Sequence, residues 1–435
     1  MVQAPPRLVC LTGHGNCWQP MKRVLFIAHR LPYPPDKGER IRAYHELKAL
    51  SQHFRVTLAA LVDGKAGRDP ASSLRPCCER IILAPAGGAT GLVRGAVSAL
   101  GGGSITEGFF RSRRLRGCLL RESRREPFDL VFAYSSSVLP FALAVTGAPR
   151  VMDLVDVDSI KWASYAESAG WPRRWLCQAE ARGVHALEAR AIEAFDAVLC
   201  VSQAEATASG FDTSRLTIVG NGVDADYFAP VRGPLNAAPS IVFTGTMDYR
   251  PNAEAVGWFV RKVWPELKRT VPDLSFTIVG RDPTRAVRRL SGVPGVSVTG
   301  AVPDVRGYLS AARVAVAPLR IARGVQNKVL EAMAMGRAVV ASPAALEGLE
   351  VTPGKHVLCA ATPQQWRRSI TELLHDDARR DKLGREARRH VVENYNWAMR
   401  MRPLVQLCLR LAGAQTPPHQ TRWAGARCTK SMSYC

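Results

Sequence analysis

The sequence predicts an α/β protein made of two doubly wound domains, each with a parallel sheet, and three observations favour that fold class. Short apolar segments alternate with segments of helical spacing along the chain, a pattern typical of parallel sheets covered by helices. The alternation is interrupted at 227–240 by proline, glycine and small residues, and then restarts. A length of 435 residues is also too great for a single hydrophobic core.

Composition narrows the functional classes without selecting one. A hydrophobic content of 47% with 22% charged residues is ordinary for a globular protein. The formal net charge of +22 indicates an anionic partner: nucleic acid, an acidic bilayer or a phosphorylated substrate. The 11 cysteines contain no C-x-x-C pair, so neither a zinc site nor a disulfide framework is predicted, and a reducing cytoplasm fits best. No apolar segment is long enough to span a bilayer.

We interpret both ends of the chain as tails. Residues 1–20 lack the apolar stretch of a signal peptide, and Met21 precedes a basic strand that resembles the start of a domain. Residues 414–435 are expected to be disordered.

In the first half, an apolar strand at 22–28 leads through a proline-rich loop with Gly38 into a helix at 39–50. No hairpin signal separates the strands expected at 55–62 and 80–84, so the sheet should be parallel. The other elements expected in this half are a long helix at 171–195 and strands at 129–133, 150–154, 197–202 and 216–219.

Three aspartates crowd the carboxyl end of the strand at 150–154. Asp153, Asp156 and Asp158 lie where ligands and catalytic groups collect in parallel sheets. Aspartates at such positions also cap helices, so at least one of them is expected to be structural.

A basic run at 109–127 contains seven arginines, interleaved with leucines after two phenylalanines. This composition is typical of a helix lying on an anionic membrane surface. A solvated surface helix with a narrow core stripe is an equally good interpretation. Nucleic acid is a weaker one, because the aromatic residues are adjacent and not interleaved for base stacking.

After the linker at 227–240, strands end at Gly245, Gly280 and Gly300, and glycine there lets a ligand approach the backbone closely. Helices are expected at 253–267, 305–311, 363–374 and 379–411.

The stretch at 313–342 predicts a strand at 313–319, a basic turn at 320–324, a helix at 325–335 and a second strand at 338–341. Lys328 and Glu331 are three residues apart and share a face of the helix. With the amide ends of the helix, Lys328 would hold a diphosphate, and Glu331 would accept the hydroxyls of a ribose. A solvated ion pair on an ordinary helix is the alternative.

Six motifs in a fixed order carry a family resemblance. They are PPDKGERIRAYHELKAL, DLVDVDSIKW, GNGVDADYF, GTMDYRPNAEAVGWF, VTGAVPDV and GVQNKVLEAMAMGRAVVAS. From 21 to about 411 the chain resembles the retaining GT-B glycosyltransferases of family four, and most closely the sugar transferases associated with exosortase and PEP-CTERM systems. The resemblance implies two Rossmann-like domains facing a cleft, with a nucleotide-diphosphate sugar held by the second.

The resemblance also implies roles for individual residues. Glu331 would accept the ribose hydroxyls, Gly324 and Val325 would lie at the phosphate end, and Asp156 would stand near the acceptor. Asp156, Lys328 and Arg323 are the expected catalytic residues. The expected donor-binding set is Gly38, Gly245, Arg250, Gly280, Val302, Gly324, Val325, Leu330 and Glu331.

Two positions depart from the wider family. Arg323 stands where the family usually has the first glutamate of its pair, and Thr246 replaces an arginine expected directly after the glycine of the FTG segment. These departures move the expected phosphate cations to Arg250, Arg320, Arg323 or Lys328. No metal motif appears, and no metal is expected. The resemblance implies that the leaving diphosphate itself takes the acceptor's proton while cations of the protein stabilise the developing charge.

The resulting expectation is a glycosyltransferase acting, with retention, on a lipid-linked or polysaccharide acceptor in exopolysaccharide synthesis. It would be cytoplasmic, either free or peripheral on the inner face of the plasma membrane. A nucleotide-sugar 2-epimerase of the same fold and a non-catalytic protein binding nucleic acid or membrane are the alternatives, with nucleic acid the least favoured partner. The expected divisions are an acceptor-side domain at 21–230, a donor domain at 231–397 and a helix crossing back at 398–413.

Overall fold

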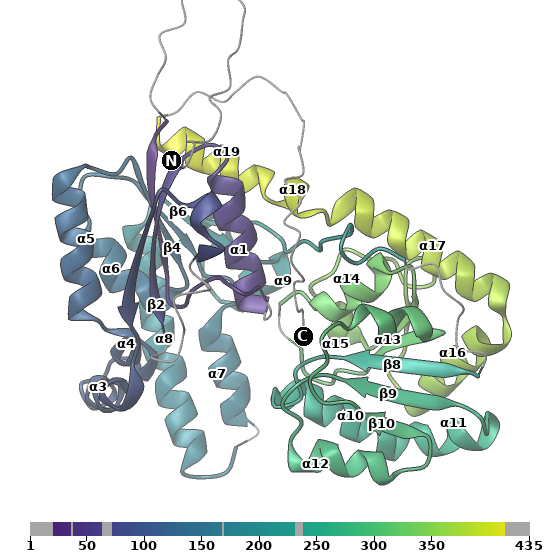
Figure 1. Cartoon of the computed structure of the whole chain (residues 1–435). Helices are drawn as coiled ribbons and strands as arrows, with labels where there is room; N and C mark the ends of the chain where they lie inside the picture. The colour runs from purple at the N-terminus through teal and green to yellow at the C-terminus, as the bar shows by residue number, and fades with distance from the viewer. Residues whose placement is uncertain are drawn as a thin grey trace, which may run out of the picture.

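The computed structural model describes residues 21–35, 38–62, 72–167, 169–230, 238–322 and 324–413. The tails predicted at 1–20 and 414–435 lie outside the described residues, as do Arg323 and half of the predicted linker. The described chain forms two α/β units that lie side by side, with the last helices running along both of them (Figure 1).

The first sheet is parallel throughout and has the order β3-β2-β1-β4-β5-β6-β7. In its centre Phe26 of β1 pairs with Leu58 of β2 and Phe132 of β4, and the two phenylalanine rings stack 5.0 Å apart. The strands are β1 (Arg23–Ala28), β2 (Arg55–Val62), β3 (Arg80–Pro85), β4 (Leu130–Tyr134), β5 (Arg150–Asp153), β6 (Ala197–Cys200) and β7 (Leu216–Ile218).

Helices cover both faces of this sheet, as its two separate clusters of buried side chains require. They are α1 (Gly38–Leu50), α3 (Gly88–Leu100), α4 (Ile105–Phe110), α5 (Arg113–Arg125), α6 (Leu139–Ala144), α7 (Asp158–Glu167), α8 (Arg173–Ala194) and α9 (Gln203–Ala208). Short 3-10 turns occupy Arg75–Cys77, Ser136–Val138 and Thr213–Arg215.

The second sheet repeats the plan, with the order β10-β9-β8-β11-β12-β13 and parallel pairing throughout. Its strands are β8 (Ser240–Thr244), β9 (Ser275–Val279), β10 (Val296–Val298), β11 (Val314–Ala317), β12 (Ala338–Ala341) and β13 (Leu358–Cys359). Its helices are α10 (Arg250–Lys262), α11 (Trp264–Thr270), α12 (Arg285–Arg288), α13 (Arg306–Ala311), α14 (Asn327–Ala334), α15 (Pro343–Leu346) and α16 (Pro363–His375), with a 3-10 turn at Arg289–Gly292.

The described part of the chain ends with α17 (Asp377–Asn394), α18 (Trp397–Arg400) and α19 (Arg402–Leu411). α17 packs on the second core through Leu383 and Ala387, whereas α19 packs on the first core through Leu404 and Cys408. The last helices therefore bridge the two units, as the yellow ribbon in Figure 1 shows.

Three expected helices are divided, and the one expected at 379–411 forms α17, α18 and α19. The helix expected at 253–267 breaks at Val263, just before Pro265, into α10 and α11. The basic run at 109–127 divides between α4 and α5, and Leu115 and Leu119 of α5 are fully buried in the first core. The apolar stripe of this run therefore packs into the protein core, as the interpretation of a solvated surface helix predicts.

The α/β prediction with two doubly wound parallel sheets is confirmed. In both sheets the chain moves outward from the central strand and then restarts on its other side, which creates a switch point between β1 and β4 and another between β8 and β11. Within the described ranges no helix has both the length and the apolar character needed to cross a membrane.

Candidate functional site

A cavity of about 570 Å³ lies between the two domains, at the carboxyl ends of the central strands. Its lining includes His29 after β1 and Ser135 after β4, and on the opposite side Gly245 after β8. Parallel sheets of this topology leave room for ligands at the switch point, because adjacent loops there run to opposite faces. The cavity has the size of a small-molecule site.

Two glycine loops form the floor of the cavity on the side of the second domain. Gly245 donates its amide to the Val279 carbonyl at 3.0 Å. A Cβ at Gly280 would lie 1.7 Å from the Gly245 carbonyl oxygen, so no larger residue fits without moving backbone. A Cβ at Gly245 would in turn lie 3.4 Å from Cε of Lys328. Glycine at these strand ends thus lets the two loops pack against each other and brings the Gly245 loop close to the Lys328 side chain.

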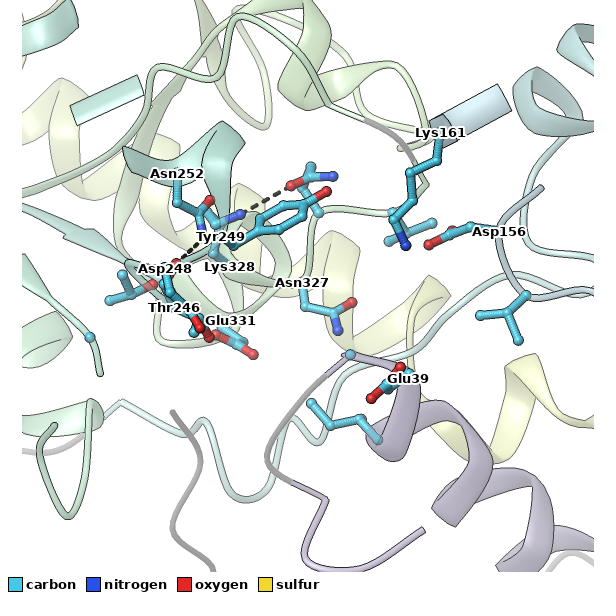
Figure 2. Close-up of a pocket in the computed structure, with 18 of the residues that line it drawn as sticks. Glu39, Asp156, Lys161, Thr246, Asp248, Tyr249, Asn252, Asn327, Lys328 and Glu331 are labelled. Atoms are coloured by element: carbon cyan, nitrogen blue, oxygen red, sulfur yellow. Dashed lines mark hydrogen bonds between the residues drawn. The ribbon is translucent and has the colours of Figure 1, made fainter. Parts of the chain in front are cut away.

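The α14 helix presents its amino end to the same cavity. Gln326, Asn327, Lys328 and Glu331 all line it, so Lys328 and Glu331 both face the cavity (Figure 2). Lys328 Nζ donates to Gln326 Oε1 at 3.0 Å. The helix starts two residues later than expected, which leaves Val325 on the loop at the cavity wall.

Burial shifts the pKa values of Lys328 and Glu331 so that the neutral form of each is favoured. Desolvation raises the pKa of Glu331 to about 7, although the Lys328 charge opposes this shift. The same desolvation lowers the pKa of Lys328 to about 8, against the attraction of Glu331. A lysine and a glutamate held near their titration points respond strongly to a charged ligand.

Two amides leave unused acceptors at the cavity. Asn252 donates Nδ2 to the Thr246 carbonyl at 2.9 Å, but its Oδ1 is buried with no hydrogen-bond partner among the described residues. The Asn327 Oδ1 is likewise buried with no hydrogen-bond partner among the described residues. Both residues line the cavity, and buried acceptors of this kind are normally satisfied by a ligand or by water.

Asp156 reaches the cavity from a tight turn after β5. Val155 adopts a φ of +67°, and its amide donates to Asp153 Oδ1 at 2.7 Å. Burial raises the pKa of Asp156 to about 7, and the nearby charge of Glu205 adds to the shift.

Gly324 of the second domain lies directly against Asp156. A Cβ at Gly324 would be 2.2 Å from Asp156 Oδ1, and its φ of +62° also favours glycine. Glu205 joins these two segments: its carboxylate accepts from the Val157 amide at 3.1 Å and from the Gly324 amide at 3.2 Å.

Charged side chains from the first domain form the facing wall (Figure 2). Although burial opposes it, the pKa of Glu39 falls to about 2, because His29 and Arg30 stabilise its carboxylate. Lys161 on α7 pairs with Asp158 at 3.2 Å, and Asp158 holds the Lys161 pKa above its usual value. Lys161 thus supplies a cation opposite the α14 helix.

The structure brings most of the sequence-predicted site residues together and leaves others out. Gly38, Asp156, Gly245, Gly280, Val325, Lys328 and Glu331 line the cavity. Gly324 lies behind it, between Asp156 and Glu205. Arg323 falls outside the described residues.

Besides Gly324, three of the expected donor-binding residues do not line the cavity. The Arg250 side chain is engaged by Glu254, one turn along α10, at 2.6 Å. Leu330 is fully buried on the core face of α14. Val302 packs against the second core.

Sequence reasoning missed Glu39, Lys161, Glu205 and Asn252. Glu39, Lys161 and Asn252 lie within the motif segments PPDKGERIRAYHELKAL, DLVDVDSIKW and GTMDYRPNAEAVGWF, but their spacing gives no sign that they line one cavity. Glu39 and Lys161 belong to the first domain, and Asn252 lies on α10 of the second. Glu205 lies in none of the six motifs. Among the residues that the structure places, no group of three or more His, Cys, Asp or Glu side chains is arranged to hold a metal ion.

The second domain is similar to a known protein family. Residues 238–376, which hold the second sheet and its helices, match the family described as "Glycosyl transferases group 1". A comparison with curated protein sequences finds no significant match.

Solved structures match nearly the whole chain. Sucrose-phosphate synthase from Thermosynechococcus elongatus superposes with a TM-score of 0.68 at 19% identity, over 91% of this chain and 100% of that one. Anabaena HepE, in complex with UDP and glucose, gives 0.63 at 14% identity over 88% and 98%. WaaG, a glycosyltransferase involved in lipopolysaccharide biosynthesis, gives 0.63 at 14% identity over 88% and 99%.

The chain has the GT-B fold. In this GT-B protein Lys328 and Glu331 lie within the segment that matches the glycosyltransferase family, while Glu39, Asp156 and Lys161 belong to the other domain.

Proposed function

We propose that this GT-B protein is a glycosyltransferase that binds a nucleotide-diphosphate sugar in the cleft, against α14. The observation that carries the proposal is the shared surface of Lys328 and Glu331 at the amino end of α14, inside a cavity of about 570 Å³. The family match over 238–376 and the complex of HepE with UDP and glucose agree with such a donor.

In the proposed complex Glu331 accepts hydrogen bonds from the ribose hydroxyls, and the diphosphate lies at the amide end of α14 beside Lys328. Lys161 approaches the sugar and phosphate from the other domain, and it takes over part of the role of the cations that the wider family places after the first glycine loop. The buried acceptors of Asn252 and Asn327 receive donor groups of the nucleotide or the sugar.

The reaction proposed is transfer with retention, as in the retaining enzymes of family four that the chain resembles. The bond between the anomeric carbon and the diphosphate oxygen breaks, and the acceptor oxygen bonds to the same face of that carbon. The acceptor's proton passes to the departing diphosphate, so the protein needs no separate metal. Lys328 and Lys161 stabilise the charge that develops on the leaving group. Asp156 orients the acceptor hydroxyl.

We further propose a lipid-linked or polysaccharide acceptor in exopolysaccharide synthesis of the exosortase-associated type. Support comes from the six ordered motifs and from the likeness to WaaG, whose role is in lipopolysaccharide biosynthesis.

The test is a panel of nucleotide sugars screened by thermal shift and then by calorimetry. A ligand that binds only the folded state raises the melting temperature. Glu331→Gln and Lys328→Met should each weaken the best donor by roughly 10- to 100-fold, the expected loss of a hydrogen bond to a charged group. Glu193→Gln and Lys262→Met, which change exposed residues outside the cavity, are the matched controls.

If neither Glu331→Gln nor Lys328→Met changes the donor affinity, the assignment of the donor site to Lys328 and Glu331 is wrong. A donor converted to its epimer with no acceptor present would identify the 2-epimerase reaction instead.

A further inference from the structure

Exposed apolar side chains are concentrated at one end of the first domain. Thirteen large hydrophobic residues are strongly exposed in the described part of the chain, and seven of them belong to α3 and to the start of α8. Those seven are Leu92 (65% exposed), Val93 (64%), Val97 (62%), Leu100 (89%), Trp171 (87%), Trp175 (60%) and Leu176 (45%). We name them the α3–Trp surface.

An ordinary surface helix turns its large apolar residues toward the core, whereas α3 turns them toward solvent. Here the buried residues are Gly91 and Gly95. A Cβ at Gly91 would lie 3.1 Å from the Phe109 carbonyl oxygen, and one at Gly95 would lie 3.0 Å from that of Ile105. The glycine face of α3 therefore packs closely on α4, and the leucine and valine face is left to solvent.

The two parts of the α3–Trp surface are held near each other through α4. Ser104, four residues beyond Leu100, donates its hydroxyl to Glu180 of α8 at 2.8 Å. Glu180 also accepts from the Ile105 amide at 2.6 Å, and it follows Leu176 by about one helical turn. In Figure 1, α3 and the beginning of α8 lie at the same lower end of the first domain.

The two segments that carry this surface are basic, although exposed Glu167 precedes the second one. Residues 87–104 and 168–179 contain no aspartate or glutamate. Arg173 and Arg174 are exposed between the two tryptophans, and neither forms an ion pair within the described ranges. Exposed Arg111, which follows α4, adds to the same rim.

We propose that the α3–Trp surface docks this protein onto the face of an anionic lipid bilayer. Exposed leucine and valine supply the apolar area that enters the interface. Tryptophan favours the boundary between hydrocarbon and headgroups, and arginine next to it binds anionic headgroups. A bilayer is favoured over an acidic protein partner, because exposed tryptophans and leucines next to arginines match the interfacial region of an anionic membrane.

This inference relocates the membrane contact that the basic run at 109–127 suggests. The leucines of that run are in the core, so its arginines can add attraction but no insertion. The α7 helix, which packs against α8, carries Lys161 at the cavity. Docking through α3 and α8 would therefore bring the cleft near the membrane, where a lipid-linked acceptor resides.

Vesicle flotation of the full chain tests the proposal, and it needs no nucleotide sugar. The vesicles contain equal parts of phosphatidylcholine and phosphatidylglycerol, or phosphatidylcholine alone. The protein should float with the anionic vesicles, and Trp171→Ala/Trp175→Ala and Leu92→Ser/Val97→Ser/Leu100→Ser should each lower binding roughly tenfold or more. Val392→Ser/Met399→Ser, which removes exposed apolar side chains of α17 and α18, should bind as the original chain does.

Three results would overturn the proposal. The first is absence of vesicle binding, or equal binding by both apolar variants. The second is loss of binding only on Arg113→Glu/Arg114→Glu/Arg116→Glu, which would assign the contact to α5. The third is a dimer that the α3 variant dissociates in gel filtration without any vesicle binding, which would make this surface an interface between copies. Donor-induced thermal shifts of the same variants report separately on the nucleotide-sugar site.

Discussion

At the scale of single residues, burial in the cleft favours the neutral forms of Lys328 and Glu331. Glu331 has a pKa of about 7 and Lys328 a pKa of about 8, each because desolvation outweighs the attraction of the other. In the free protein Glu331 is therefore ionised mainly above pH 7 and Lys328 is charged mainly below pH 8. Both charged forms coexist best in the interval between these values.

We predict that the affinity for a nucleotide-diphosphate sugar passes through a maximum between about pH 7 and pH 8. Below the pKa of Glu331 the ribose loses its acceptor, and above the pKa of Lys328 the diphosphate loses its cation. Each limb should approach about tenfold per pH unit, if the neutral form of the residue does not bind. Calorimetry from pH 5 to pH 9 measures both limbs.

The variants assign each limb to its residue. Glu331→Gln should flatten the acid limb and Lys328→Met the alkaline limb, each with weaker binding at the optimum. Asp156→Asn is measured in parallel, because Asp156 also has a pKa of about 7. If both limbs persist in both variants, other groups control the pH dependence and the roles of Lys328 and Glu331 are wrong.

At the scale of elements, α1 is fixed by a buried ionic network that also supports the Asp156 turn. Arg42 is fully buried and donates Nε to Asp153 Oδ2 at 2.7 Å. One of its terminal nitrogens donates to the Val219 carbonyl at 2.7 Å and to Asn221 Oδ1 at 2.9 Å. Since Asp153 in turn accepts from the Val155 amide, Arg42 ties α1 to the loop that presents Asp156.

We predict that Arg42→Met lowers the free energy of unfolding by about 3–5 kcal/mol, the usual cost of leaving a buried partner charge unpaired. The pKa of Glu46 is already raised by burial and by Asp153, so the loss of Arg42 leaves two carboxylates with no buried cation beside them. Urea unfolding followed by circular dichroism measures the change.

Arg250→Ala is the matched control for this prediction. It removes an exposed ion pair with Glu254 and should change stability by less than about 1 kcal/mol. Equal losses in the two variants would show that the buried network contributes no more than a surface pair.

The elements also show which features are predictable from sequence. The strands β2 and β12 match their expected bounds because uninterrupted apolar runs between polar turns specify buried parallel strands. The Arg42 network could not be predicted, because Asp153 and Asn221 are 111 and 179 positions away along the chain. Arg250 was expected at the phosphate, but a local partner at helical spacing engages it instead.

At the scale of the whole molecule, half of the candidate site depends on how the domains meet. Lys328 and Glu331 were predictable, since their spacing on one helix after a strand defines a face. Glu39 and Lys161 were not, because only the arrangement of the two domains brings α1 and α7 opposite α14. Gly324 fits against Asp156 for the same reason.

The path of the last helices couples the two domains. The chain leaves the second core with α17, and α19 then buries Leu404, Leu407 and Cys408 in the first core. A helix that follows the second domain in sequence thus completes the core of the first. The stability of the first sheet should therefore depend on residues more than 180 positions beyond its last strand, at Leu216–Ile218.

We predict that Leu404→Ala destabilises the first domain by about 2–5 kcal/mol, the range for truncating a fully buried leucine. Hydrogen exchange in mild urea should show faster exchange in β1 and β4, with β8 and β11 less affected. Leu373→Ala, which truncates an equally buried leucine of α16 in the second core, should give the opposite pattern. If Leu404→Ala instead loosens only the second sheet, α19 does not complete the first core in solution. If both variants increase exchange equally in both sheets, the two domains unfold as one unit. The reason would be that the bridge from α17 to α19 and the contacts across the cleft hold the domains too tightly for either to open separately.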